Sequence, residues 1–185
     1  MTASQYGQAH RGALTLRKME LADLELVRRW LADPVVADWY LTGSTLEDQL
    51  EHLRLSIVGE EPTEVLTVAE DGRPIGWCQW YMCHKYPEHA AAVGAAPDDA
   101  GIDYAIGDAT RRGSGLGTAL IAALVAHIRQ RHPHAGVISD PEASNIGSRR
   151  VLERNGFQLL AEQPLASEPT RAVMAVYRLP PDVGP

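Results

Sequence analysis

The chain has 185 residues, of which 45% are hydrophobic, and it carries a formal net charge of −7 at pH 7. This size supports one globular domain with its own core, and no apolar run reaches the length of a membrane span. The acidic balance argues against nucleic acid as a partner and is compatible with a cationic small-molecule substrate. Met1–Arg11 is polar and lacks the apolar core of a signal peptide, and Cys78 and Cys83 would face opposite sides of one strand. We therefore expect two unpaired thiols in a cytoplasmic protein.

The first half of the chain predicts two helices and a hairpin. The expected elements are a strand at Ala13–Arg17, a helix at Asp23–Ala32, a helix from Leu46 to Gly59, and strands at Glu64–Glu70 and Arg73–Cys83. Pro34 should stop the first helix. Ser44-Thr45-Leu46-Glu47 is typical of a capping box before the second helix. Asp71-Gly72 is a two-residue hairpin turn.

The second half predicts alternating strands and helices after an irregular segment. The expected elements are an irregular stretch at His84–Ala100, a strand at Gly101–Gly107, a helix at Ala119–Arg131, a strand at Val137–Asp140, a helix after Asn145, a strand, and a last strand at about Arg171–Leu179. This order predicts one mixed sheet of the α/β (α+β) class. The domain would span residues 12–180, between an N-terminal tail at 1–11 and a C-terminal tail at 181–185.

A glycine-rich loop lies between the predicted strand at 101–107 and the helix that follows. It reads Arg112-Gly113-Ser114-Gly115-Leu116-Gly117-Thr118. Glycines allow sharp turns and close approach to a ligand, and the free N–H groups at the start of a helix attract an anion. The loop has no lysine for a Walker motif, and its glycine spacing does not fit a dinucleotide-binding motif. The sequence therefore predicts a different phosphate site.

The pattern of Arg112, Gly115 and Gly117 resembles the acetyl-coenzyme A loop of the GCN5-related N-acetyltransferases. A second stretch, from Asn145 to Glu153, Gly156 and Phe157, is similar to the second signature of that superfamily. The resemblance implies a mixed sheet with a V-shaped cleft for acetyl-CoA between the strands at Ile102–Gly107 and Gly136–Asp140. It implies that the coenzyme is bound by the backbone around the loop and by a polar side chain on the pantetheine side. The residues so implied are Arg112, Gly113, Ser114, Gly115, Leu116, Gly117, Thr118 and Asn145. We also expect backbone N–H groups near Ile106 to hydrogen-bond the thioester oxygen.

Three further stretches look like one subfamily, the aminoglycoside 6′-N-acetyltransferases. They are Gly101-Ile102-Asp103, the run from Ser139 to Asn145, and the hairpin from Asp71 to Tyr81. The resemblance implies that Asp103 contacts the amine and is a candidate for accepting its proton, and that Asp140 binds other ammonium groups. We treat both as the catalytic candidates. Because a carboxylate is a weak base, Asp103 would act through water or by positioning.

A polycationic substrate also requires further carboxylates and an aromatic wall. Strand alternation places Gln79 and Tyr81 on the pocket side of the hairpin, because a glutamine in a core needs a partner. The remaining candidates are Trp39 and Tyr40 in an expected loop, and Glu88, Asp98 and Asp99 in the irregular segment. Purely structural roles remain open for these acids: a turn or helix cap for Asp140, a surface position for Asp103, and solvated loop positions for Glu88, Asp98 and Asp99. The histidines show no metal spacing.

One residue departs from the superfamily pattern. Many members carry a tyrosine seven residues after the motif's asparagine, as general acid for the leaving thiolate, and here Leu152 stands at that position. We still expect direct attack of the amine on the thioester, without a cysteine intermediate, because a thiolate is a fair leaving group. Two alternatives remain: a siderophore-type hydroxylysine N-acyltransferase, whose members tend to have histidine at the Asp103 position, and a coenzyme A-binding module without activity. A peptide acetyltransferase and either a monomer or a homodimer also stay open.

Overall fold

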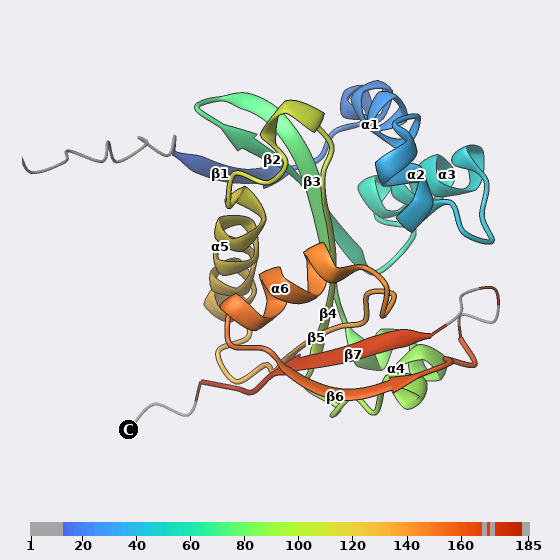
Figure 1. The fold of residues 1–185 in the computed structure, drawn as a ribbon, viewed down its shortest axis with the longest axis vertical. Coiled ribbons are helices and arrows are strands. Elements are labelled where there is room, and N and C mark those ends of the chain that lie inside the picture. The colour runs from blue at the N-terminus through green and yellow to red at the C-terminus, as the bar shows by residue number, and fades with distance from the viewer. Residues whose placement is uncertain (1–12, 168–169, 171–172, 183–185) are drawn as a thin grey trace, which may run out of the picture.

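The computed structural model describes residues 13–167, 170 and 173–182, and the expected tails fall mostly outside this range. Within it, seven strands form one sheet in the order β1-β2-β3-β4-β5-β7-β6 (Figure 1). The strands are β1 Leu14–Lys18, β2 Thr63–Glu70, β3 Arg73–Met82, β4 Ala100–Ile106, β5 Val137–Ser139, β6 Gln158–Gln163 and β7 Met174–Leu179. The helices are α1 Leu24–Leu31, α2 Pro34–Tyr40, α3 Leu46–Val58, α4 Pro87–Val93, α5 Leu116–Arg131 and α6 Ile146–Arg154.

The sheet is mixed, and its one parallel pair among the described strands is β4 with β5. The two strands pair at Ala100–Val137 and Gly101–Ile138 and then part. β4 continues to Ile106 alongside β3, whereas β5 ends at Ser139. The predicted V between splayed parallel strands is therefore confirmed.

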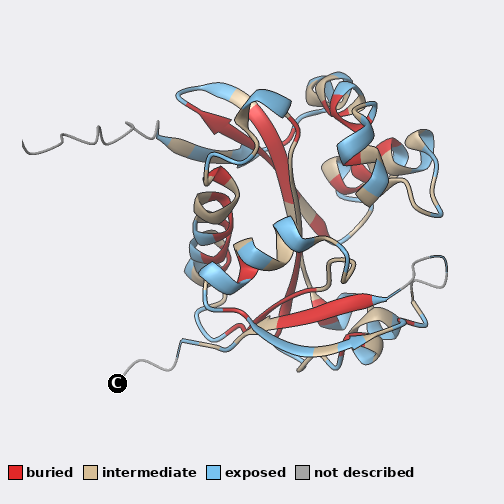
Figure 2. Ribbon diagram, viewed as in Figure 1, coloured by how far each residue is buried: buried red, intermediate tan, exposed pale blue. Residues whose placement is uncertain are grey.

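Helices cover both faces of the sheet. α5 and α6 bury one stripe against the larger core, in which Leu120, Leu124 and Leu152 pack with residues of β2, β3 and β7. α1, α2 and α3 pack on the opposite face around Trp77, and α4 packs beside Ile138 and β7. Buried residues accordingly follow the sheet and the inner sides of the helices (Figure 2). None of the helices in the described part of the chain is long and apolar enough to cross a membrane.

Two helices were not predicted. The first helix ends at Leu31, before Pro34 as predicted, but Pro34 also starts α2 as its first residue. The Asp33 side chain caps α2 by accepting from the Val35 N–H at 2.9 Å. Pro87 likewise starts α4 within the stretch expected to be irregular, and Gly94 closes it with φ +65°. Proline at the first helical position lacks an N–H that would have had no partner anyway. Trp39 and Tyr40 therefore belong to a helix and not to a loop.

Local signals elsewhere were close to correct. The capping box of α3 is made by Thr45 and Asp48, one residue later than predicted, with reciprocal bonds of 3.1 and 3.0 Å. Asp71 and Gly72 both have positive φ, +50° and +78°, as a type I′ hairpin turn requires. These elements fix β2 and β3 as a long hairpin, and β3 forms one wall of the cavity described next.

Candidate active site

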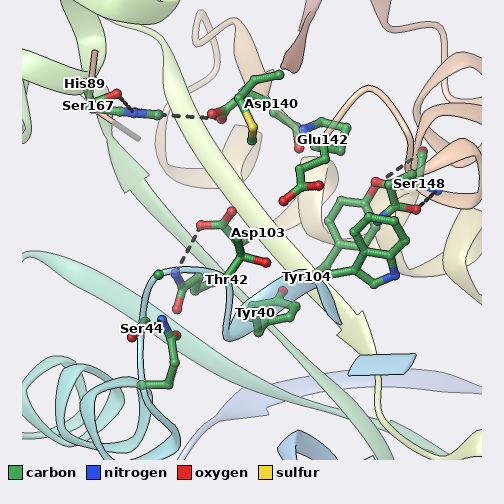
Figure 3. A pocket seen from close by; sticks show the side chains of 18 of the residues that line it. Tyr40, Thr42, Ser44, His89, Asp103, Tyr104, Asp140, Glu142, Ser148 and Ser167 are labelled. Atoms are coloured by element: carbon green, nitrogen blue, oxygen red, sulfur yellow. Dashed lines mark hydrogen bonds and ion pairs between the residues drawn. The ribbon is translucent and has the colours of Figure 1, made fainter. Parts of the chain in front are cut away.

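A cavity of about 620 Å³ opens at the parting of β4 and β5. Its walls come from α2 and the following loop, from β3 and β4, from α4, and from the segment between β5 and α6 (Figure 3). Six of the nine candidate substrate residues line it: Trp39, Tyr40, Gln79, Tyr81, Asp103 and Asp140. Sequence positions more than a hundred residues apart thus meet in one space.

Asp103 lies on β4 directly opposite Gln79 on β3. The Gln79 Nε2 donates a hydrogen bond of 3.0 Å to Asp103 Oδ2, which supplies the partner that a half-buried glutamine needs. Tyr81 lies two residues further along β3, and its ring covers Gly101, where any Cβ would lie 2.4 Å from the ring. Burial raises the pKa of Tyr81, so its phenol is neutral. This face of the hairpin therefore presents one carboxylate among neutral polar groups.

Asp140 follows β5 and is held by a residue that the sequence analysis did not select. His89 Nε2 on α4 lies 3.5 Å from Asp140 Oδ1, and His89 Nδ1 lies 3.0 Å from Ser167 Oγ. Asn145 rather than Asp140 caps α6, since its Oδ1 accepts from the Ser148 N–H at 3.0 Å. Asp140 is thus available to the cavity and does not serve as the helix cap.

A third carboxylate reaches the same space. Glu142 lines the cavity, and Figure 3 shows its carboxyl group directed toward the region of Asp103. The sequence contained Glu142 within the Ser139–Asn145 motif but gave no reason to select it over other acids. Only the path of the chain between β5 and α6 brings it to the cavity.

The acids of the 84–100 segment take different places. Glu88 and Asp98 are exposed and are not among the described residues that line the cavity. Asp99 is buried and accepts from Arg178 Nε and Nη2 at 2.9 and 2.8 Å, and from the Ala96 N–H at 2.8 Å. The expectation of a solvated or substrate-facing Asp99 was therefore wrong. Asp99 is a buried carboxylate paired with the Arg178 guanidinium, since burial of a charge requires a partner of opposite charge.

Aromatic packing positions α2 against the cavity. Trp77 is buried and stacks on Trp30 with ring centroids 5.9 Å apart, and the Tyr40 ring lies 5.0 Å from Trp77. Trp77 therefore belongs to the core under α1 and α2. Tyr40 has one side on that core and lines the cavity with the neighbouring Trp39, which gives the wall an aromatic side.

The glycine loop connects the part of β4 that lies beyond its pairing with β5 to the start of α5. Gly113 and Gly115 have φ of +75° and +85°, and α5 begins at Leu116. At Gly117 an added Cβ would lie 3.2 Å from Val151, so a side chain there would press on α6. The loop thus exposes the N–H groups of the first turn of a 16-residue helix. This arrangement fits a pyrophosphate group held by backbone donors.

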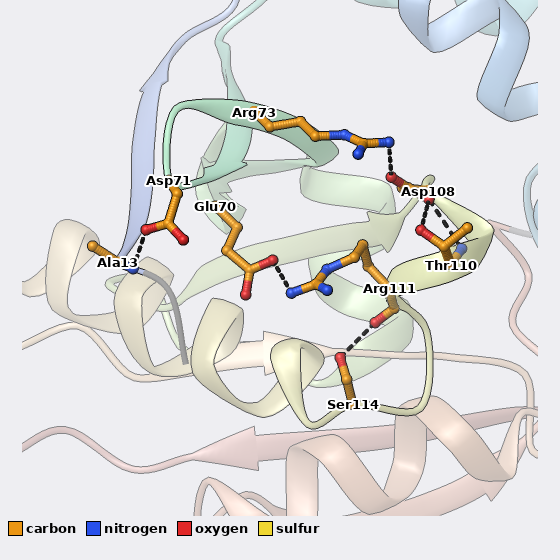
Figure 4. A network of polar contacts seen from close by, with 8 residues as sticks. All are labelled: Ala13, Glu70, Asp71, Arg73, Asp108, Thr110, Arg111 and Ser114. Carbon is orange, nitrogen blue, oxygen red and sulfur yellow. Dashed lines mark hydrogen bonds and ion pairs between the residues drawn. The ribbon is translucent and has the colours of Figure 1, made fainter. Parts of the chain in front are cut away.

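Arginine side chains fasten this loop to the rest of the protein. Arg112 Nε and Nη2 donate to the carbonyl oxygens of Ile106 and Gly107 at 3.0 and 2.9 Å, and Nη1 lies 3.1 Å from Asp33 Oδ1. Arg111 pairs with Glu70 on β2 (Figure 4). The guanidinium of Arg112 is therefore engaged with protein groups, and the backbone N–H groups of this loop are the candidate donors to a phosphate.

The cysteines do not form part of the site. Both thiols are buried and unpaired, and burial raises the pKa of Cys78 well above its usual range and that of Cys83 to about 12. Neither residue is among those described as lining the cavity. A thiol of this kind is inert, because the thiolate is the nucleophile.

A mixed sheet that splits at one parallel pair, with a glycine loop opening a helix beside the split, defines an acetyltransferase. The chain belongs to the acetyltransferase (GNAT) domain family, whose model matches residues 20–165. It is similar to the aminoglycoside N(6')-acetyltransferase type 1 of Klebsiella pneumoniae, with 29% identity over 149 residues, covering 79% of this chain and 74% of the relative. It is also similar to the lysine N-acyltransferase MbtK of Mycobacterium sp. (strain MCS), with 28% identity over 165 residues, covering 89% of this chain and 66% of the relative.

The solved structures give the same family. The crystal structure of aminoglycoside acetyltransferase AAC(6')-Ib in complex with coenzyme A has a TM-score of 0.73 and 27% identity, covering 91% of this chain and 95% of that chain. An aminoglycoside N(6')-acetyltransferase from Legionella pneumophila, at 16% identity and a TM-score of 0.73, shares the fold. The protein is therefore an enzyme of the GNAT acetyltransferase class.

Proposed function

We propose that the protein transfers the acetyl group of acetyl-CoA to the 6′-amine of aminoglycoside antibiotics and thereby confers resistance. The observation that carries this proposal is the cavity, which gathers three carboxylates, Asp103, Asp140 and Glu142, beside the aromatic side chains of α2. A polycation with several ammonium groups matches this distribution of charge. The similarity to proteins named as aminoglycoside acetyltransferases supports the same substrate class.

The loop and cleft would hold acetyl-CoA. Backbone N–H groups at Arg112–Thr118 would hold the pyrophosphate, those near Ile106 on β4 would donate to the thioester oxygen, and Asn145 would contact the pantetheine arm. Acetyl-CoA supplies an activated thioester. Arg112 keeps the loop in position through Ile106 and Gly107, so the backbone donors are organised before the ligand arrives.

Asp103 would orient the reacting amine. The carboxylate is held by Gln79, so its direction into the cavity is set by the pairing of β3 and β4. It pairs with the incoming ammonium and receives a proton directly or through water, which leaves the nitrogen lone pair for attack on the carbonyl carbon. Asp140, tethered to His89, and Glu142 bind further ammonium groups. Both thiols are buried and lie outside the described cavity lining, which supports direct transfer without a cysteine acyl-enzyme.

A lysine-type substrate is the second candidate, because MbtK proteins are among the relatives. A lysine or hydroxylysine side chain presents one amino group, which needs one carboxylate. Three carboxylates around one cavity match several ammonium groups better. The aspartate at position 103, in place of histidine, supports the same choice. We place the reaction in the cytoplasm, in accord with two unpaired thiols.

The experiment compares both substrates with both donors. Coenzyme A release is followed with an aminoglycoside carrying a 6′-amine and with N6-hydroxylysine, each with acetyl-CoA and with a long-chain acyl-CoA. We expect turnover with the aminoglycoside and acetyl-CoA. Turnover confined to hydroxylysine, or a preference for the long-chain donor, would instead assign the protein to the lysine acyltransferases.

A further inference from the structure

A tyrosine hydroxyl lies across the open end of the V. Tyr104 is on β4, one residue after Asp103, and its Oη lies 2.6 Å from Ser148 Oγ and donates to the Ser148 carbonyl oxygen at 3.4 Å. Ser148 is in the first turn of α6. One side chain thus links the two elements that flank the predicted path of the thioester.

Tyr104 and Asp103 reach the same cavity although neighbours on a strand point to opposite faces. This is possible because β5 leaves β4 after Gly101, so the sheet is open beyond that point. Figure 3 shows the Tyr104 ring and Ser148 together, to one side of the Asp103 carboxyl group. The cavity therefore has a carboxylate and a phenol on its two sides.

The phenol keeps its proton in this setting, which is the state from which a general acid must start. Burial raises the pKa of Tyr104, and the adjacent Asp103 charge raises it further, against the opposing effect of the hydrogen bond with Ser148. The phenol is therefore neutral around pH 7. The thiolate that leaves a thioester is at that point the strongest acceptor near it, and a neutral phenol can give it a hydrogen bond or a proton.

Helix geometry relates Tyr104 to the unusual Leu152. Leu152 is fully buried in the core and follows Ser148 by four residues, on the same side of α6. Side chains lean toward the N-terminus of their helix, so a phenol at position 152 would extend over the turn that carries Ser148. The Tyr104 hydroxyl, which extends from β4, already lies against that turn of α6.

We propose that Tyr104 is the general acid for the leaving thiolate and that Ser148 positions its hydroxyl; this inference rests on the proposed acetyl transfer. The amine lone pair forms the C–N bond, the C–S bond breaks, and its electron pair stays on sulfur. The Tyr104 Oη proton moves to that sulfur and gives the free thiol. The proton lost from the amine passes to Asp103 or water, and the phenol regains a proton through the Ser148 hydroxyl from solvent.

The test removes one hydroxyl. Tyr104→Phe is compared with Tyr177→Phe, which deletes a buried hydroxyl that donates to Glu153 Oε1 at 2.7 Å, outside the described cavity lining. We expect kcat to fall roughly 10²-fold in Tyr104→Phe, with the KM for the amine unchanged, and to stay near wild type in Tyr177→Phe. Equal kcat in the two variants would overturn the proposal.

A binding measurement tests the contact with sulfur without turnover. Calorimetry compares coenzyme A with desulfo-coenzyme A, which lacks the thiol. Tyr104→Phe should lower the affinity for coenzyme A about fivefold and leave that for desulfo-coenzyme A unchanged. Equal losses for both ligands would show that Tyr104 holds the arm or the fold, and would contradict the proposal.

Two further outcomes are separated by this design. If the wild type binds coenzyme A but acetylates no amine, the proposed function fails, while the ratio of the two affinities still tests the contact of Tyr104 with sulfur. If Tyr104→Phe does not fold, Ser148→Ala replaces it. This variant should lower the ratio of the affinity for coenzyme A to that for desulfo-coenzyme A, with a smaller loss of kcat. If both this affinity ratio and kcat in Ser148→Ala equalled the wild-type values, the inference would be overturned.

Discussion

Replacing the carboxylate of Asp103 by an amide should separate orientation of the amine from binding of the coenzyme. Asparagine has the same shape, and its Oδ1 can still accept from Gln79, so Asp103→Asn removes the charge and keeps the position. A hydrogen bond with a charged group contributes about 1.5–3 kcal/mol. Since every 1.4 kcal/mol is about tenfold, we expect kcat/KM for a 6′-amino aminoglycoside to fall roughly 10- to 100-fold.

Steady-state release of coenzyme A provides the assay. The KM for acetyl-CoA should stay near the wild-type value, because the loop at 112–118 is unchanged. Asp98→Asn is the matched control: it makes the same change of charge at an exposed acid outside the described cavity lining. If Asp103→Asn and Asp98→Asn had the same kcat/KM, the general negative field and not the position of Asp103 would explain activity, and the reasoning would be refuted.

Three further changes test the coenzyme loop, the buried Asp99–Arg178 ion pair and the pH dependence of stability that comes from Asp23. Gly115→Asp should abolish coenzyme A binding in calorimetry, whereas Gly59→Asp, at a similar φ of +80° against +85°, should retain it; retained binding in both would place the phosphate elsewhere. Asp99→Ala should lower the free energy of unfolding by about 3 kcal/mol, because it leaves Arg178 without its carboxylate partner. Asp98→Ala, at an exposed acid, should change the Tm little. Equal Tm values for the two variants would contradict a stabilising Asp99–Arg178 pair. The hydrogen bond from Arg17 lowers the pKa of Asp23 in the folded protein. The ionised Asp23 therefore stabilises the fold above the pKa of an unfolded aspartate, about 4, and this stabilisation is lost as the pH falls through the lower pKa of the folded state. The Tm gap between wild type and Asp23→Asn should therefore narrow in acid; a gap independent of pH would contradict this.

The sequence predicted those parts of the fold whose signals are local. The Asp71-Gly72 turn joins β2 and β3 in register, whereas the separate pairing of β3 with β4 places Gln79 opposite Asp103. The two missed helices, α2 and α4, both begin at a proline, and proline is compatible either with a stop or with a first helical residue. Only packing against Trp77 and against Ile138 decides between these outcomes.

The site was harder to predict than the fold because it depends on where chain segments meet. Asp98 and Asp99 are adjacent acids, yet one is exposed and the other is buried with Arg178, 79 residues away. Glu142 reaches the cavity only through the path from β5 to α6. Strand alternation points Tyr104 and Asp103 to opposite faces of β4, and Tyr104 reaches the cavity because β4 and β5 part. No local pattern carries such information.

The central claim is that this cavity presents the 6′-amine of an aminoglycoside to acetyl-CoA. The most direct measurement is coenzyme A release by the wild-type protein with a matched pair of aminoglycosides that differ only in a 6′-amine or a 6′-hydroxyl. We predict turnover with the amine, a product acetylated at the 6′ nitrogen, and none with the hydroxyl. Equal turnover with both, or turnover with neither despite tight binding of acetyl-CoA, would contradict the assignment.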